Sequence, residues 1–288
     1  MDTLSQANGA FALHLYRALS DAGGSLFFSP LSISATLAMV QLGARTHTEK
    51  ELGEVHTHTH THTHTHNRVL RFKQVPDLHS HFQHVVSEIS APTSSHLLKA
   101  ANRLYGEITF SFLPNVSRPV QMMFQVKKLP LRFIPEQNLQ VLELPYEKET
   151  LSMFIVLPNE KNILDWTDRS KMDVWTDVVV RLPRFRLEQD FSLVDTLVKM
   201  GVASLFDEGV ADLSGMAGGR GLFVSALAHS AVCEVGEEGT EAAAATGAVA
   251  SFCMMREEHF TADHPFLFLI THNPTRSILF LGRYCGPP

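Results

Sequence analysis

Few side chains in this sequence could carry out covalent chemistry, and the thiol of Cys253 is the most conspicuous of them. A cysteine attacks only as a thiolate, so it needs a nearby base or positive charge to lower its pKa. The residues around Cys253 supply no such base, and the chain contains no Gly-x-Ser-x-Gly, P-loop or His-Glu-x-x-His motif. Cys233 lies among alternating apolar residues and is expected in the core. We therefore predict that the protein is not an enzyme.

A histidine–threonine repeat is the second candidate for chemistry. Six histidines alternate with five threonines over residues 56–66. Alternate residues of an extended strand share a face about 7 Å apart, so neighbouring imidazoles could hold zinc or nickel. The repeat has no apolar face to bury, however, and such low-complexity segments need not pack. We interpret residues 56–67 as a polar loop insertion at the surface, and we assign no metal site and no cofactor.

A row of small residues occupies every second position between 240 and 250. The row consists of Thr240, Ala242, Ala244, Thr246, Ala248 and Ala250. In a strand these side chains would share one face, and their small size would let the strand enter a packed sheet without overpacking it. The alternative is an alanine-rich helix, since alanine is the best helix former. The flanking Gly239 and Gly247 and the strand-rich surroundings favour the strand.

The elements that would position these residues are helices early in the chain and strands later. Apolar residues at helical spacing predict helices at 7–19, 78–89 and 191–200, and a further helix begins at Ser29-Pro30 and ends at Gly43. Alternating or continuous apolar residues predict strands at 98–104, 141–144, 151–157, 178–182, 185–187 and 227–235, and a hairpin of 266–270 with 278–281. This order indicates an α+β fold with mostly antiparallel sheets in a single domain, residues 1–288.

Composition and charge exclude several classes of protein. The chain has 288 residues, of which 44% are apolar and 19% charged. This share of apolar residues is sufficient for a large hydrophobic core. A net charge of −6 argues against nucleic acid as a partner, and no apolar run reaches the roughly 18–20 residues of a membrane span. Residues 1–6 do not read as a secretory signal. We expect a cytoplasmic protein, with release from the cell without a signal peptide left open.

Five stretches of the sequence resemble the serpins. Residues 234–246 resemble the hinge of the serpin reactive loop, 260–268 the strand after that loop, 277–283 the C-terminal strand, 28–34 the buried second helix, and 211–216 a further serpin motif. The resemblance covers nearly the whole chain except residues 56–67. The chain is identified as similar to the ovalbumin-type intracellular clade of this superfamily, which implies a serpin-like fold.

The resemblance implies inhibition of serine proteases by a suicide mechanism. The reactive loop, residues 236–259, would be offered as a substrate, acylated by the protease, and then inserted into the central sheet together with the protease. Its implied hinge consists of Glu237, Glu238, Gly239, Thr240, Glu241, Ala242, Ala243, Ala244, Ala245 and Thr246. The family's spacing from Gly239 places the reactive bond at Cys253–Met254, which suits an elastase-like pocket. The alternative bond, Phe252–Cys253, suits a chymotrypsin-like pocket.

The resemblance also implies a shutter beneath the sheet. His229 matches the family's strand histidine, and Ser32 matches a serine of the second helix that guards sheet opening. Without the resemblance, a single histidine of this kind would be interpreted as a hydrogen-bonded core residue. The implied partners are elastase-like or chymotrypsin-like serine proteases, and the implied state is a monomer.

The resemblance is interrupted between Pro114 and Arg118. At this point the family has helix F, the third strand of the central sheet, a conserved tryptophan and two strands of a second sheet, and this chain has none of them. We expect one side of the insertion slot to lack a strand to pair with, leaving unpaired edges. The alternative function is therefore a non-inhibitory serpin-like binding protein, or a truncated isoform that is only a protease substrate.

Overall fold

The computed structural model describes residues 3–20, 23–53, 77, 80, 82–83, 99–103, 120–135, 139–146, 149–157, 171–174, 176–236 and 257–287. Its helices are α1 (Thr3–Leu19), α2 (Pro30–Gly43), α3 (Thr46–Gly53), α5 (Val194–Lys199), the 3-10 turn η7 (Ser204–Phe206) and α6 (Ser214–Ala217). The histidine–threonine repeat, the junction at 114–118 and most of the helix expected at 78–89 lie outside the described residues.

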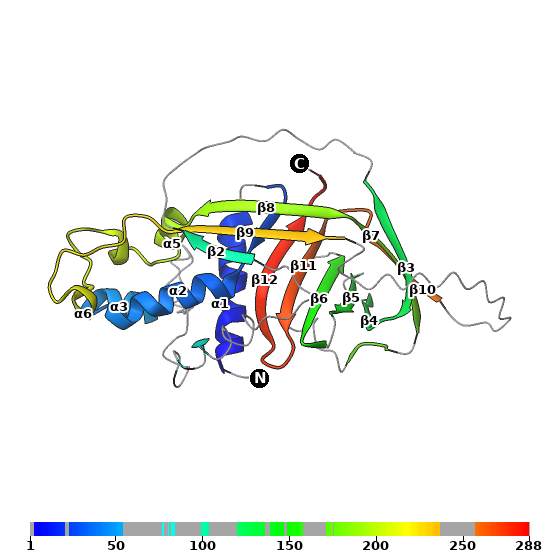
Figure 1. Ribbon diagram of the computed structural model, residues 1–288, viewed down its shortest axis with the longest axis horizontal. Helices are drawn as coiled ribbons and strands as arrows, with labels where there is room; N and C mark the ends of the chain where they lie inside the picture. Colours follow the sequence, from blue (N-terminus) through cyan, green and yellow to red (C-terminus); the bar gives the residue numbers. More distant parts are fainter. Residues whose placement is uncertain are drawn as a thin grey trace.

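The described strands form three sheets (Figure 1). The largest sheet has the order β1-β12-β11-β6-β5-β4, and its strands are β1 (Leu26–Phe28), β12 (Ser277–Tyr284), β11 (Phe266–His272), β6 (Leu151–Leu157), β5 (Leu139–Pro145) and β4 (Leu131–Ile134). The second has the order β10-β7-β3, with β10 (Glu257–Thr261), β7 (Asp177–Pro183) and β3 (Met122–Lys128). The third has the order β2-β9-β8, with β2 (Lys99–Arg103), β9 (Ala228–Val235) and β8 (Phe185–Ser192).

These elements confirm the α+β fold with helices early and mostly antiparallel sheets. Of the strand pairs in the described part of the chain, β10 with β7 is parallel and the others are antiparallel. The C-terminal hairpin forms as expected, and its turn runs through residues 273–276. No helix in the described ranges is long and apolar enough to cross a membrane.

The helix starts follow local capping chemistry, with one correction. Ser29 caps α2 as expected: its hydroxyl accepts a hydrogen bond from the backbone N–H of Ser32, and Pro30 follows in the first turn. The helix expected at 191–200 is shorter, because Phe191 continues the β8 ladder opposite His229 and α5 begins only at Val194. The strand ladder therefore takes precedence over helical spacing in the first residues of this segment.

An aromatic cluster joins β8 to the largest sheet. Phe27 stacks on Phe268 and Phe280, with ring centroids 5.7 and 5.2 Å apart. Phe185 of β8 contacts the edge of Phe268 and stacks on Tyr284 at 4.6 Å. In Figure 1, β8 and β9 run across the ends of β11 and β12, while α1 and α2 lie against β12. The central core therefore lies where the third sheet crosses the largest one.

Candidate functional site: the β2–β9–β8 sheet and its contact with α2

β9 is the strand that leads into the predicted reactive loop, and both of its edges are paired. Its eight residues pair antiparallel with β8, from Val235 opposite Phe185 to Ala228 opposite Ser192. On its other edge β2 pairs antiparallel, from Val232 opposite Lys99 to Ala228 opposite Arg103. The expectation that one side of the slot has no strand is therefore wrong: β2 lies directly against β9 over five residue pairs. β2 takes this position because an exposed strand edge gains hydrogen bonds by pairing with an available strand.

Three side chains of β9 alternate into the core, and His229 is the first of them. His229, Ala231 and Cys233 are buried, whereas the intervening residues are partly or fully exposed. Burial raises the pKa of the Cys233 thiol to about 12, so this thiol stays protonated at neutral pH. The sequence-based interpretation of Cys233 as a core residue is therefore confirmed.

His229 accepts a hydrogen bond from the first residue of the α2 region. The backbone N–H of Ser29 donates to Nε2 of His229 at 2.9 Å, and both residues are buried. This geometry requires Nε2 to carry a lone pair, so the imidazole is neutral. Burial lowers the pKa of His229 to about 4, although the charge of Asp190 opposes this shift. The bond ties the middle of the β2–β9–β8 sheet to the start of α2.

Ser29 contacts His229 directly through its backbone N–H, and its hydroxyl makes two further contacts. The Ser29 hydroxyl donates to the carbonyl oxygen of Leu279 in β12 at 2.7 Å and accepts from the Ser32 backbone N–H at 3.2 Å. Ser32 is thus connected to His229 through Ser29. Ser29 is therefore a junction between β9, α2 and the largest sheet.

A second polar junction holds α1 against α2 and β12. The side-chain amide of Asn8 donates to the carbonyl oxygen of Ile278 at 2.8 Å, and the Ser34 hydroxyl lies 3.5 Å from Oδ1 of Asn8. Both side chains are buried. A buried serine and asparagine that satisfy each other avoid the cost of unpaired polar groups.

Gln189 connects β8 to the strand β1, and its role was not visible in the sequence. Its carbonyl oxygen accepts from the Phe27 backbone N–H, and its amide donates to the carbonyl oxygen of Ser25, each at 2.7 Å. This bidentate contact satisfies backbone groups on the edge of β1. No local pattern distinguishes Gln189 from other polar residues of a strand, because its partners lie about 160 residues away.

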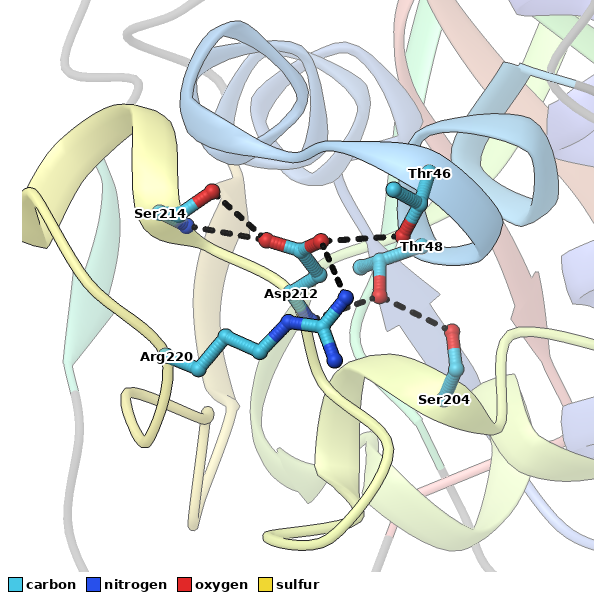
Figure 2. A network of polar contacts seen from close by, with 6 residues as sticks. All are labelled: Thr46, Thr48, Ser204, Asp212, Ser214 and Arg220. Atoms are coloured by element: carbon cyan, nitrogen blue, oxygen red, sulfur yellow. Dashed lines mark hydrogen bonds and ion pairs between the residues drawn. The ribbon is translucent and has the colours of Figure 1, made fainter.

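The motif at 211–216 forms a polar network beside α3 (Figure 2). The residues of the network are Thr46, Thr48, Ser204, Asp212, Ser214 and Arg220. The Asp212 carboxylate accepts from the hydroxyls of Ser214 at 2.7 Å and Thr46 at 3.0 Å. These hydrogen bonds, with a smaller contribution from the charge of Arg220, hold the pKa of Asp212 below its ordinary value. The network fixes the 203–220 segment to the α2–α3 junction and offers no reactive group.

The predicted loop residues fall mostly outside the described part of the chain. The hinge residues Glu237–Thr246 and the reactive-bond residues Phe252, Cys253 and Met254 lie in the undescribed range 237–256. At its two ends, Gly236 follows β9 directly, and Glu257, Glu258 and His259 already belong to β10. Within the described ranges, no three histidine, cysteine or acidic side chains gather as metal ligands.

Comparisons with known proteins agree with this geometry. A family model described as "Serpin (serine protease inhibitor)" matches residues 6–118 and 107–287. Two similar sequences are leukocyte elastase inhibitor A of Mus musculus, 35% identical over 394 aligned positions, and leukocyte elastase inhibitor of Xenopus tropicalis, 36% identical over 393. Both alignments cover all of each chain, although this chain has only 288 residues. In the sequence, residues 100–106 and 250–254 also resemble the corresponding stretches of leukocyte elastase inhibitor.

Solved structures show the same fold. A tumour-suppressing serpin solved at 2.1 Å matches with a TM-score of 0.81 at 24% identity, and all of both chains is covered. Uncleaved ovalbumin matches with a TM-score of 0.76 at 23% identity, covering 99% of this chain and 100% of its own. The extra alignment positions agree with a serpin fold from which a segment is missing. Because the sequence motifs, the sheet order and both kinds of comparison agree, this chain belongs to the serpin family.

Proposed function

We propose that this protein inhibits elastase-like or chymotrypsin-like serine proteases by the serpin suicide mechanism. The observation that carries the proposal is β9, a strand paired on both edges, which ends directly before residues 237–256, the segment predicted from the sequence to contain the hinge and the reactive bond. Family membership supports it, as do relatives that are named leukocyte elastase inhibitors. The chain's role is then that of an inhibitor and not of an enzyme.

In this proposal the slot for the cleaved loop lies between β9 and β2. Insertion separates the five described β2–β9 residue pairs and replaces that ladder with two, an antiparallel ladder between the new strand and β9 and a parallel ladder between the new strand and β2. Each added ladder hydrogen bond contributes about 1 kcal/mol net. Insertion of this kind, for which serpins are the standard example, releases strain stored in the uncleaved form.

The contact between His229 and Ser29 would control that opening. It holds β9 to the start of α2, and Ser29 in turn is held to β12. When β2 moves away, this contact and the ladder with β8 hold β9 in place. We therefore assign Ser29 and His229 the shutter role, with Ser32 supporting Ser29 through its backbone N–H.

A second candidate is a serpin that proteases cleave but that does not trap them. The observation in its favour is that, among the described residues, β2 supports the slot over five residues against eight in β9. If insertion is too weakly driven, hydrolysis of the acyl intermediate finishes first. The cytoplasmic location and the single-domain organisation remain predictions beside both candidates.

Denaturing gel electrophoresis after incubation with neutrophil-type elastase or chymotrypsin separates the two candidates. Trapping gives a stable band at the summed mass of both proteins, whereas a cleaved band alone selects the substrate-only candidate. Mass spectrometry of the released C-terminal peptide should find Met254 as its first residue with elastase, or Cys253 with chymotrypsin. A peptide that begins after Arg256 would contradict the placement of the reactive bond and point to a trypsin-like target.

A pair of alanine variants tests the insertion step. Ala244→Glu places a carboxylate on the face that enters the core, where burying an unpaired charge costs several kcal/mol, so any inhibitory activity should be lost while cleavage continues. Ala243→Glu is the matched control, because its side chain falls on the opposite face of the inserted strand. Equal inhibition by both variants would contradict the assignment of the inward face.

A further inference from the structure

The strand β3 presents an apolar stripe at the edge of its sheet. In the described part of the chain β3 pairs with β7 alone and is the last strand of the β10-β7-β3 sheet. Met122, Phe124 and Val126 are 39%, 64% and 50% exposed, while Met123 between them packs on the core. An exposed apolar row on an edge strand is a template for pairing with another chain.

The backbone groups of the same three residues point away from β7. The Arg184 backbone N–H donates to the carbonyl oxygen of Gln121, so Gln121 belongs to a hydrogen-bonded pair of the β3–β7 ladder. Hydrogen-bonded and non-hydrogen-bonded pairs alternate in an antiparallel ladder. The N–H and C=O groups of Met122, Phe124 and Val126 therefore face the open edge, beside their own exposed apolar side chains.

We propose that β3 pairs antiparallel with β3 of a second copy of this chain, in a two-fold register centred on Phe124. In this register Phe124 lies opposite Phe124 of the second copy, and Met122 lies opposite Val126. All three are hydrogen-bonded pairs, so the outward N–H and C=O groups of both strands are satisfied. The apolar rows of the two copies then form one continuous surface.

The charges on β3 select this register. Lys127 and Lys128 end the strand, and lysines of this kind usually discourage edge pairing. With Phe124 at the centre, Lys127 lies opposite Gln121 and Lys128 opposite Val120, so no like charges meet. Moving the centre to Val126 would instead place Lys128 opposite Phe124 and break the match between the two apolar rows. The sequence is thus complementary to itself, which favours a second copy over an unrelated strand.

A contact on the neighbouring strand supports the exposed position of Phe124. Arg181 of β7 lies opposite Phe124 in the ladder, and its guanidinium carbon is 5.6 Å from the centroid of the Phe124 ring. This cation–π contact holds the ring on the outer face of the sheet. The ring is therefore oriented for pairing before a second copy arrives. The sequence predicted a monomer; this proposal instead predicts an equilibrium between monomer and dimer.

Analytical ultracentrifugation of the intact chain over a range of concentrations tests the proposal. The wild type should show a reversible monomer–dimer equilibrium. Phe124→Lys and Phe124→Glu each place like charges at the two-fold axis and remove the two apposed apolar rings, which should raise the dimer dissociation constant about a hundredfold or more. Val210→Lys changes another exposed apolar residue, in a distant turn, and should leave the constant unchanged. Circular dichroism melts establish that each variant is folded.

An equimolar mixture of Phe124→Lys and Phe124→Glu gives the decisive result. In the proposed register the introduced lysine of one copy faces the introduced glutamate of the other, so the mixture should dimerise although neither variant does so alone. A wild type that stays monomeric at every concentration would overturn the proposal, and so would association that both Phe124 variants retain. If β3 pairs only with a strand of a different protein, the wild type alone will stay monomeric, and this result would also overturn the proposal.

Discussion

Acidification should weaken this fold at one identifiable contact, the hydrogen bond from Ser29 to His229. Nε2 of His229 accepts the Ser29 backbone N–H at 2.9 Å, and a protonated Nε2 cannot accept it. Protonation would also place a positive charge in a buried site and leave the Ser29 N–H without its acceptor. The imidazole must therefore either stay neutral or leave its site.

The size of the effect follows from the two pKa values. The pKa of His229 is about 4 in the native state, against 6.5 for an unperturbed histidine. Because the native value is the lower one, the unfolded state binds the proton first, and the stabilisation is complete above pH 6.5 and is lost as the pH falls towards 4. Linkage gives a loss of about 2 kcal/mol between about pH 7.5 and about pH 5, and about 3 kcal/mol at still lower pH.

Urea unfolding at several pH values measures this loss directly. In His229→Asn the contribution of the titrating imidazole is absent, so the free energy of unfolding of the variant relative to wild type should rise by about 2 kcal/mol from pH 7.5 to pH 5. The exposed His259, changed in the same way, controls for the loss of an imidazole elsewhere and should retain the wild-type acid loss. A constant difference between His229→Asn and wild type across this range would refute the reasoning.

Three further changes test the packing and the polar junctions. Gly282→Ala should cost about 1–3 kcal/mol of stability in thermal unfolding, because the new Cβ would lie 2.5 Å from the Phe268 ring and 3.0 Å from the Leu26 carbonyl oxygen. Gly236→Ala, whose nearest neighbour would be Nε of Arg184 at 3.7 Å, is its control, and equal losses would contradict the close packing. Ser29→Ala should cost about 2 kcal/mol in urea unfolding, since it removes both the α2 cap and the hydrogen bond to Leu279. Asp212→Ala should lower the melting temperature at neutral pH, and because the pKa of Asp212 is depressed, this difference from wild type should shrink as the pH falls below about 4.

Much of the architecture could be predicted from local sequence. The structure confirms several features that depend on neighbouring residues: the cap at Ser29 followed by Pro30, the apolar runs of β5 and β6, a strand at β7, the alternation of β9, and the C-terminal hairpin. The burial of Cys233 followed from the same alternation. The serpin motifs were sufficient to predict the family, because they are specific and are spread along most of the chain.

Tertiary structure alone decided which distant residues meet. Nothing in the local sequence predicted that β2 would take the edge of β9, because the choice of a strand's partner depends on which edges a shortened chain leaves open. His229 accepts a hydrogen bond from Ser29, 200 residues away, and Gln189 reaches β1 across a similar separation. Side-chain spacing along the chain determines which face each residue occupies, but contacts across sheets depend on how those sheets cross, and that is set only when the whole core packs.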